Sequence, residues 1–276
     1  MSVEITPSVT VGAGQKLLII AGPCQIESLE HCLMIGKHLK ELCEKLPVSF
    51  VFKSSFDKAN RTSVGGKRGV GMDQGLSILA SVRSSLNVPV LTDVHTEAQA
   101  IEVGRVVDVL QIPAFLCRQT DLLIAAGKTG KTIHVKKGQF LHPSDMRFVA
   151  EKIASTGNTK IMLCERGTSF GYRDLVVDPR SFLMMKETGY PVVFDATHSV
   201  QQLGGTGGSS GGSRQYVQAL ARAAVAVGVD GVFIECHNDP DNAPSDGPCM
   251  LPLEQVGPLV KLLCAIRKTV QESSSL

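Results

Sequence analysis

Eight short apolar runs rich in Val, Ile, Leu and Phe recur along the chain and constrain its fold more than any other feature. The runs are 18–21, 48–53, 88–93, 107–112, 132–137, 160–165, 191–195 and 231–235. Segments between them, such as 28–46, 144–156 and 213–228, place apolar residues near a 3.6-residue period, which indicates helices. Strands that alternate with helices form right-handed βαβ units around a parallel sheet. Eight such units in about 250 residues suit a closed barrel, whereas an open doubly wound sheet more often has five or six strands.

We therefore predict an α/β protein with one (β/α)8 (TIM) barrel domain over residues 1–276. Residues 1–16 carry VEI and VTV around a Pro-Ser turn and should form a hairpin that closes the bottom of the barrel. The Gly/Ser segment 204–212 has the composition of a flexible linker, and its position after the seventh run suits a lid over the site. The final SSSL is expected to fray.

Composition and charge exclude several classes of partner. Lys and Arg number 28 against 26 Asp and Glu, so no excess charge indicates a nucleic acid or an anionic membrane. The start has no basic segment before its first apolar run, and the longest apolar stretch, 216–235, is broken by Arg222 and Asp230. The eight cysteines form no C-x-x-C pair, which favours reduced thiols. We expect a soluble cytoplasmic protein with no membrane or nucleic-acid partner.

A chemically reactive side chain stands near the carboxyl end of every run. These residues are Cys24, Lys53, Asp93, Gln111, Lys136, Arg166, His198 and Glu235. The carboxyl ends of barrel strands converge on one face, where the active sites of this fold lie. Strand ends are often polar simply because they meet water. Reactive residues at all eight ends, with four kinds of chemistry, favour a catalytic site instead.

Two groups of residues separate within and around this set. The first is cationic and comprises Lys53, Lys58, Arg61, Lys136 and Arg166. Because the net charge is near zero, cations gathered in one mouth predict a bound phosphate or carboxylate. The second group comprises Cys24, His198, Glu235 and Asp246. Thiolate, imidazole and carboxylate ligands suit a borderline divalent ion such as Zn²⁺ or Fe²⁺, and a buried thiol near a hydrogen-bonded histidine is the alternative.

The segment GKTGKT at 127–132 imitates a phosphate-binding loop. A full match requires glycine where Ala125 stands, and the segment precedes a run instead of following one. We therefore do not assign a nucleotide-binding loop. Among the remaining histidines, His95 and His237 lie next to predicted site positions and stay open as candidates.

Several longer motifs carry a resemblance to a known family. They are KSSFDKANRTS (53–63), TDVH (92–95), QIPAFLCRQTDLL (111–123), KKGQF (136–140), CERGTSFGY (164–172), DATHSVQ (195–201) and ECHNDPDNAPSDGP (235–248). In this order, over nearly the whole chain, they resemble 3-deoxy-D-manno-octulosonate 8-phosphate synthase. The resemblance implies a (β/α)8 barrel, commonly a homotetramer. Such an enzyme condenses phosphoenolpyruvate with arabinose 5-phosphate on the way to the Kdo sugar of lipopolysaccharide.

The same resemblance implies roles for single residues. Lys58, Lys136 and Arg166 resemble the positions that hold phosphoenolpyruvate, and Lys58 is the candidate general acid. Asn60, Arg61 and Thr62 resemble the contacts of arabinose 5-phosphate, with Arg61 on its phosphate. The remaining pocket positions are Lys53, Ser55, Asp93 and Gln111, together with Arg118, which reaches a neighbouring subunit's site.

A cysteine after Gly-Pro marks the metal-dependent members of the family, and an asparagine marks the metal-free members. Cys24 therefore implies one divalent ion, Zn²⁺, Fe²⁺ or Mn²⁺, held by Cys24, His198, Glu235 and Asp246. Cys24, His198 and Asp246 thereby join Lys58 as catalytic candidates. One departure is the segment DGPCMLPL that begins at Asp246, which looks more like that of the metal-free members.

Two other functions stay open. The nearer is a sister enzyme that makes the seven-carbon arabino-heptulosonate phosphate from erythrose 4-phosphate on the same barrel. Its usual motif is Lys-Pro-Arg-Thr, where this chain has Lys58, Ala59, Asn60 and Arg61. Asparagine can hydrogen-bond a sugar hydroxyl and the side chain of proline cannot, which favours the longer sugar. The second is a noncatalytic phosphosugar-binding protein, and the reactive residues at all eight strand ends argue against it.

Overall fold

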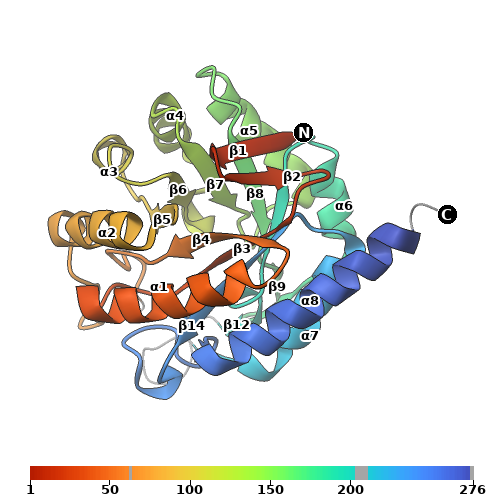
Figure 1. The fold of residues 1–276 in the computed structure, drawn as a ribbon. Helices are drawn as coiled ribbons and strands as arrows, with labels where there is room; N and C mark the ends of the chain where they lie inside the picture. Colours follow the sequence, from red (N-terminus) through yellow and green to blue (C-terminus); the bar gives the residue numbers. More distant parts are fainter. Residues whose placement is uncertain (62–63, 203–210, 274–276) are drawn as a thin grey trace.

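A closed barrel of parallel strands forms the centre of the computed structural model, which describes residues 1–61, 64–202 and 211–273 (Figure 1). Eight strands make the barrel within these residues: β3 (Leu17–Gly22), β4 (Val48–Lys53), β5 (Val90–Asp93), β6 (Val109–Ile112), β7 (Thr132–Lys136), β8 (Ile161–Glu165), β11 (Val192–Asp195) and β14 (Gly231–His237). Each strand pairs in parallel with the next, and β14 also pairs with β3, which closes the ring. Every predicted run is one of these strands, so the predicted (β/α)8 fold is confirmed.

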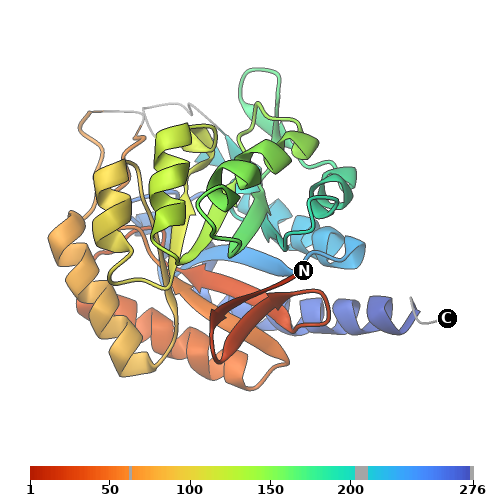
Figure 2. The same cartoon turned by 90° about the horizontal axis from the view of Figure 1, so that it is seen from above.

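Helices connect the strands and lie outside the barrel (Figures 1 and 2). They are α1 (Leu29–Glu44), α2 (Met72–Leu86), α3 (Glu97–Val103), α4 (Thr120–Lys128), α5 (Met146–Ala154), α6 (Arg180–Lys186), α7 (Val217–Val227) and α8 (Leu253–Ser273). The start of α1 is fixed by Ser28, whose side chain accepts a hydrogen bond from the His31 N–H at 3.1 Å. Buried residues at helical spacing, such as Ile35 and Leu39, then turn one face of α1 to the core.

Alternate residues of each strand face the helices or the interior of the barrel. On β4, Phe52 belongs to the cluster that packs under the helices, whereas Val51 belongs to the cluster inside the barrel. The inner cluster continues into the hairpin of β1 (Ser2–Thr6) and β2 (Val9–Gly12) through Val3 and Val11. The hairpin therefore covers the interior from the amino-terminal end of the strands, as predicted.

The remaining elements are short. They are the antiparallel pairs β9 (Thr168–Phe170) with β10 (Asp174–Val176) and β12 (Gln201–Gln202) with β13 (Gly211–Gly212), the strand β15 (Leu251–Pro252) beside β14, and the 3₁₀ turns η1 (Ala114–Leu116), η2 (Pro143–Asp145), η3 (His198–Val200), η4 (Arg214–Tyr216) and η5 (Pro240–Asn242). Most of the predicted Gly/Ser lid, Thr62 and the last three residues lie outside the described residues. In the described part of the chain, no helix is long and apolar enough to cross a membrane.

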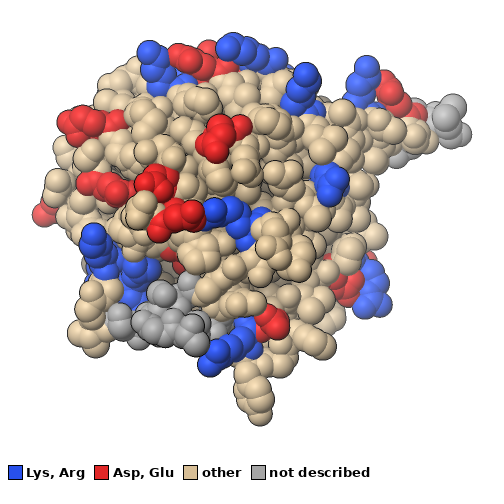
Figure 3. All heavy atoms as spheres, turned by 90° about the horizontal axis from the view of Figure 1, so that it is seen from below, with Lys and Arg blue, Asp and Glu red and all other residues tan. Residues whose placement is uncertain are grey.

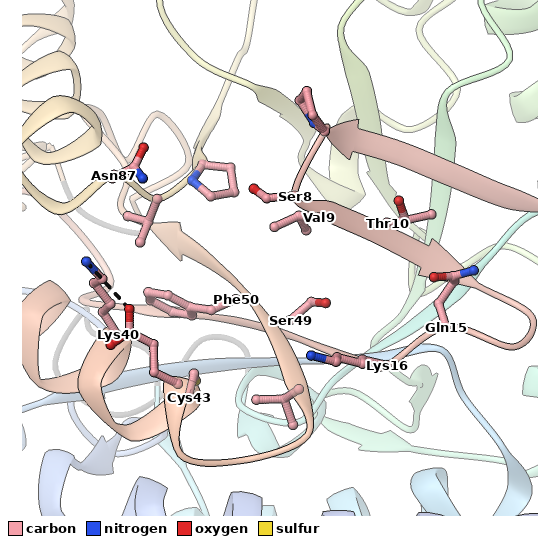
Figure 4. A pocket seen from close by; sticks show the side chains of 15 residues that line it. Ser8, Val9, Thr10, Gln15, Lys16, Lys40, Cys43, Ser49, Phe50 and Asn87 are labelled. Carbon is pink, nitrogen blue, oxygen red and sulfur yellow. Dashed lines mark ion pairs between the residues drawn. The ribbon is translucent and has the colours of Figure 1, made fainter.

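A hollow of about 390 Å³ lies at the amino-terminal end of the barrel, between the β1–β2 hairpin and α1. Figure 4 shows Ser8 and Val9 of the hairpin facing Phe50 of β4, with Lys40 of α1 on the rim. Active sites of this fold lie at the opposite, carboxyl-terminal end, so this hollow is not the predicted site. On the face drawn in Figure 3, basic and acidic side chains are interspersed, in keeping with a net charge of +2.

Candidate active site

Cys24 lies two residues beyond the end of β3, at the carboxyl-terminal mouth of the barrel. Its approach to β4 depends on Gly22, because a Cβ at Gly22 would lie 2.0 Å from the Lys53 carbonyl oxygen. The Cys24 thiol donates a hydrogen bond to Asp246 Oδ2 at 3.2 Å, although the two residues are 222 positions apart in the sequence. The closed barrel therefore brings its first and last loops together, as the predicted grouping required.

Glu235, at the carboxyl end of β14, is a buried carboxylate between two lysines. Lys53 Nζ forms a hydrogen-bonded ion pair with Glu235 Oε1 and also donates to the Cys24 carbonyl oxygen at 2.8 Å. Lys58 Nζ lies 3.7 Å from the same carboxylate oxygen. The side chains of Lys53 and Glu235 are 1% and 0% exposed, so the desolvated carboxylate is stable only because cations surround it.

His198 lies between two carboxylates on the other side of the mouth. Its Nδ1 is 2.8 Å from Asp195 Oδ2, and its backbone N–H donates to Asp195 Oδ1 at 2.8 Å. Its Nε2 is 3.3 Å from Glu235 Oε2 and 3.9 Å from Asp246 Oδ2. Lys136 Nζ donates to Asp195 Oδ2 at 2.6 Å. Asp195 thus orients the imidazole and turns its Nε2 towards Glu235 and Asp246.

Charge interactions hold these groups in defined protonation states. Burial raises the pKa of the Cys24 thiol, and the Glu235 charge raises it further. Burial opposes the charged form of Glu235, but His198 and Lys53 hold its pKa well below the usual range. For His198, burial lowers the pKa, yet Asp195 and Glu235 raise it to about 9. Burial lowers the pKa of Lys58, but Glu235 and the other acidic groups around it raise that pKa well above its usual value. Without a bound ion, the site therefore holds a neutral thiol among paired charges.

A second network covers the floor of the mouth on β5, β6 and β7. Asp93 accepts hydrogen bonds from Ser55 and Gln111, and the Gln111 side-chain oxygen is 2.9 Å from His134 Nδ1. Burial opposes ionisation of Asp93, but Lys53 and Lys58 hold the pKa of Asp93 far below its usual value. The network presents an ionised, fixed carboxylate to the space above it.

Arg166 reaches across the mouth from the end of β8. Its Nη2 donates to the His198 carbonyl oxygen at 2.6 Å and to Gln201 Oε1 at 3.0 Å, and Gln201 Nε2 donates to Asp246 Oδ1 at 3.0 Å. Arg166 Nε is buried and has no hydrogen-bond partner among the described residues. A buried guanidinium with a free donor is a suitable contact for an anion.

The predicted sugar-binding positions lie on the loop after β4, at the outer rim. Arg61 donates to Ser245 Oγ at 2.9 Å and to the Pro244 carbonyl oxygen at 2.6 Å, which ties this loop to the loop after β14. Asn60 is exposed, and Thr62 lies outside the described residues. Arg118 is also exposed, on the loop after β6, and its carbonyl oxygen accepts a hydrogen bond from Lys152 Nζ at 3.0 Å.

The donor set at the mouth fits a divalent ion. Ligand atoms of Cys24, Glu235 and Asp246 all lie within 4.8 Å of one another, and His198 Nε2 approaches two of these residues. Glu235 Oε2 is buried and has no hydrogen-bond partner among the described residues; it faces His198 Nε2 at 3.3 Å, so these two ligand atoms point to the same space. A thiol, an imidazole and two carboxylates are ligands that Zn²⁺ and other first-row divalent ions accept.

A second group, Glu27, His31 and His237, has comparable spacing but a different hydrogen-bond pattern. The Asp239 backbone N–H donates to His237 Nδ1 at 2.9 Å. Nδ1 is then the acceptor, so Nε2 of the neutral ring carries the proton and donates it to Glu27 Oε1 at 2.7 Å. His237, which the sequence left open, therefore links the loops after β3 and β14 through hydrogen bonds at both ring nitrogens.

Two residues that contact the site residues were not identified from the sequence. Asp195 is the last residue of β11 and lies on the inward side, two positions after the inner-cluster residue Val193. Strand alternation was the signal that could have identified it, but His198 was taken as the reactive residue of that strand. Gln201, which links Arg166 to Asp246, carried no such signal, because its position depends on the turn at η3.

A closed (β/α)8 barrel with cations, carboxylates and a candidate metal-ligand group at its carboxyl-terminal mouth defines a barrel enzyme that acts on anionic substrates. The chain belongs to the DAHP synthetase I family, whose model matches residues 1–272.

Curated relatives show which enzymes of the family this chain is similar to in sequence. A protein of Rhizobium meliloti is 59% identical over 261 residues, which cover 92% of this chain and 93% of the relative. A protein of Granulibacter bethesdensis is 61% identical and covers 90% of this chain and 88% of the relative. A protein of Rickettsia prowazekii is 54% identical over 96% of both chains. All three carry the name 2-dehydro-3-deoxyphosphooctonate aldolase, another name for the enzyme of the predicted resemblance, which is thereby confirmed.

Proposed function

We propose that this protein condenses phosphoenolpyruvate with D-arabinose 5-phosphate and water to give 3-deoxy-D-manno-octulosonate 8-phosphate and phosphate, for the synthesis of lipopolysaccharide Kdo. The observation that carries the proposal is the identity of 54–61% with the three octonate aldolases over at least 90% of this chain. The cations and carboxylates at the mouth support the same conclusion, because the reaction brings two anionic substrates together.

The choice of sugar rests on the relatives and on one loop. The family description by itself does not separate the octulosonate enzyme from its heptulosonate sister, whereas the names of the relatives favour the former. In the loop after β4, this chain carries Asn60, whereas the sister motif Lys-Pro-Arg-Thr has no asparagine, and the exposed amide of Asn60 can hydrogen-bond a sugar hydroxyl. Arg61, at the outer rim, suits the phosphate of the longer substrate.

Phosphoenolpyruvate is assigned to the inner part of the mouth. Lys136 and Arg166 reach it from neighbouring strands and match its carboxylate and phosphate. The enol carbon C3 is a weak nucleophile, so the aldehyde of the sugar must be held close to it and polarised. Lys58 supplies a proton to the aldehyde oxygen, and its raised pKa keeps it protonated beforehand. Water then adds at C2, and phosphate leaves.

A divalent ion, Zn²⁺, Fe²⁺ or Mn²⁺, is proposed at Cys24, His198, Glu235 and Asp246. When bound, it supplies a Lewis acid for the carbonyl or for water. Asp195 contributes by holding Nδ1 of His198, which leaves Nε2 for the ion. Lys53 neutralises one oxygen of Glu235, and the other oxygen, 3.3 Å from His198 Nε2, would meet the ion.

We further propose a cytoplasmic homotetramer in which Arg118 of one subunit completes the sugar site of another. Arg118 is exposed, and Phe115 and Phe140 on nearby loops are 47% and 60% exposed. Large exposed aromatic side chains favour an interface. All eight cysteines are free thiols, in keeping with a reducing compartment.

The test is phosphate release by the purified protein from phosphoenolpyruvate with arabinose 5-phosphate or erythrose 4-phosphate. We expect a strong preference for arabinose 5-phosphate, since each buried polar group left unpaired by the shorter sugar costs about 1–3 kcal/mol. Comparable kcat/KM values for the two sugars would contradict the assignment. Binding of both substrates without any phosphate release would favour the noncatalytic alternative.

A further inference from the structure

Lys137 is a lysine without any exposed surface, directly after the site residue Lys136. Its ammonium group lies 3.2 Å from the carbonyl oxygens of Gly138 and Gly167, 3.4 Å from that of Leu141 and 3.2 Å from Thr168 Oγ1. These acceptors come from two loops, the one after β7 and the one after β8. The ammonium group therefore ties the two loops together.

Glu165, the last residue of β8, balances this buried charge. Its Oε1 lies 3.3 Å from Lys137 Nζ, and the Glu165 side chain is 1% exposed. The same oxygen accepts hydrogen bonds from the backbone N–H groups of Arg166 at 2.8 Å and Gly167 at 2.6 Å. One carboxylate oxygen thus fixes the backbone from which Arg166 projects.

The cost of burying this pair indicates what it does. A buried ion pair is weak evidence for stability, because desolvation offsets most of the attraction. The hydrogen-bond and ion-pair partners of the two side chains are one another, backbone groups and the Thr168 hydroxyl. What the pair determines is the relative position of residues 136–141 and 165–168, and therefore of Lys136 and Arg166.

We propose that Lys137 and Glu165 form a positioning pair that sets Lys136 and Arg166 at the correct separation for phosphoenolpyruvate. The inference rests on the proposed function, because phosphoenolpyruvate is the ligand of the two positioned cations. The pair touches neither substrate. Its loss should therefore weaken phosphoenolpyruvate binding and leave arabinose 5-phosphate, which is assigned to the loop after β4, largely unaffected.

The test is the double variant Lys137→Met/Glu165→Gln, which removes both charges and leaves no unpaired ion in the core. We expect the KM for phosphoenolpyruvate to rise at least tenfold, while kcat and the KM for arabinose 5-phosphate stay within about threefold of wild type. Hydrogen exchange at the Arg166 and Gly167 amides should accelerate. A folded double variant with wild-type KM for phosphoenolpyruvate, or with both KM values raised alike, overturns the proposal.

Two further variants keep the test decisive. Glu165→Gln alone changes no heavy-atom count, and if the double variant does not fold, an unchanged phosphoenolpyruvate KM in Glu165→Gln overturns the proposal. Lys186→Met is the matched control. Lys186 lies 3.5 Å from Asp230, whose carboxylate likewise accepts a backbone N–H, that of Val192 at 2.9 Å, but at the amino-terminal end of the barrel. The Lys186→Met variant should leave the KM values for both substrates unchanged.

A failure of the positioning pair can be distinguished from a failure of the proposed function. Wild-type protein that releases no phosphate with either sugar contradicts the function. In that case, calorimetric titration of phosphoenolpyruvate into the same variants decides the positioning pair. Equal affinity of wild type and double variant for phosphoenolpyruvate overturns it.

Discussion

His134 offers a test of the buried network beneath the mouth through the pH dependence of stability. Its ring is fully buried on β7, donates from Nδ1 to Gln111 and stacks on Phe233 with an interplanar angle of 10°. Burial and, secondly, the charge of Lys136 lower the pKa of His134 from 6.5 to about 3. The folded chain therefore keeps this imidazole neutral under conditions in which the unfolded chain protonates it.

The sign and size of the effect follow from this shift. Between pH 6.5 and about 3 the unfolded state binds the additional proton, so the free energy of unfolding falls as the pH falls. The loss attributable to His134 is about 2 kcal/mol at pH 5 and about 3 kcal/mol at pH 4 relative to neutral pH. Other carboxylates also lose stability on acidification, so the contribution of His134 must be obtained as a difference between proteins.

The perturbation is His134→Phe, which keeps an aromatic ring beside Phe233 and removes the titrating group. Urea unfolding at pH 7.5, 6 and 5 should show a lower stability than wild type at pH 7.5, because Gln111 loses its donor at a cost of about 1–3 kcal/mol. The two proteins should converge by about 2 kcal/mol at pH 5. His38→Phe, on the exposed side of α1, is the control and should keep the wild-type slope. Parallel pH profiles for wild type and His134→Phe would refute the reasoning.

Three further predictions concern the mouth. Arg61→Ala should raise the KM for arabinose 5-phosphate far more than the KM for phosphoenolpyruvate, since a charge-assisted contact is worth about 1.5–3 kcal/mol. If only the KM for phosphoenolpyruvate rises, the two anion sites are assigned in reverse. Chelation should abolish the activity of the wild-type enzyme, and a divalent ion should restore it. The Cys24→Asn variant should keep measurable activity that a chelator no longer affects. Full activity of wild-type enzyme that elemental analysis shows to be metal-free refutes the metal site. Asp195→Asn should lower the affinity for the ion tenfold or more, because His198 loses the acceptor that orients its ring. If a competition titration shows unchanged ion affinity, Asp195 does not orient His198 for the ion.

The sequence by itself determined the architecture. Runs of apolar residues mark the strands, and helical periodicity marks the segments between them, because both patterns depend only on local geometry. The barrel followed from counting the units, and the side of the active site followed from the rule that strand ends converge at one mouth. Cys24 and Glu235 could be grouped in advance for the same reason: the first and last strands of a closed barrel are neighbours.

Only the tertiary structure decided which side chains meet and which protonation states they hold. The hydrogen bond from Cys24 to Asp246, the pair of Lys136 with Asp195 and the enclosure of Lys137 all join residues brought together by barrel closure and loop geometry. The part played by His237, which the sequence left open, was likewise decided by contacts: the backbone N–H of Asp239 donates to its Nδ1, and its Nε2 donates to Glu27. Such contacts depend on the distances and orientations of side chains far apart in the sequence, and local residue patterns carry no information about them.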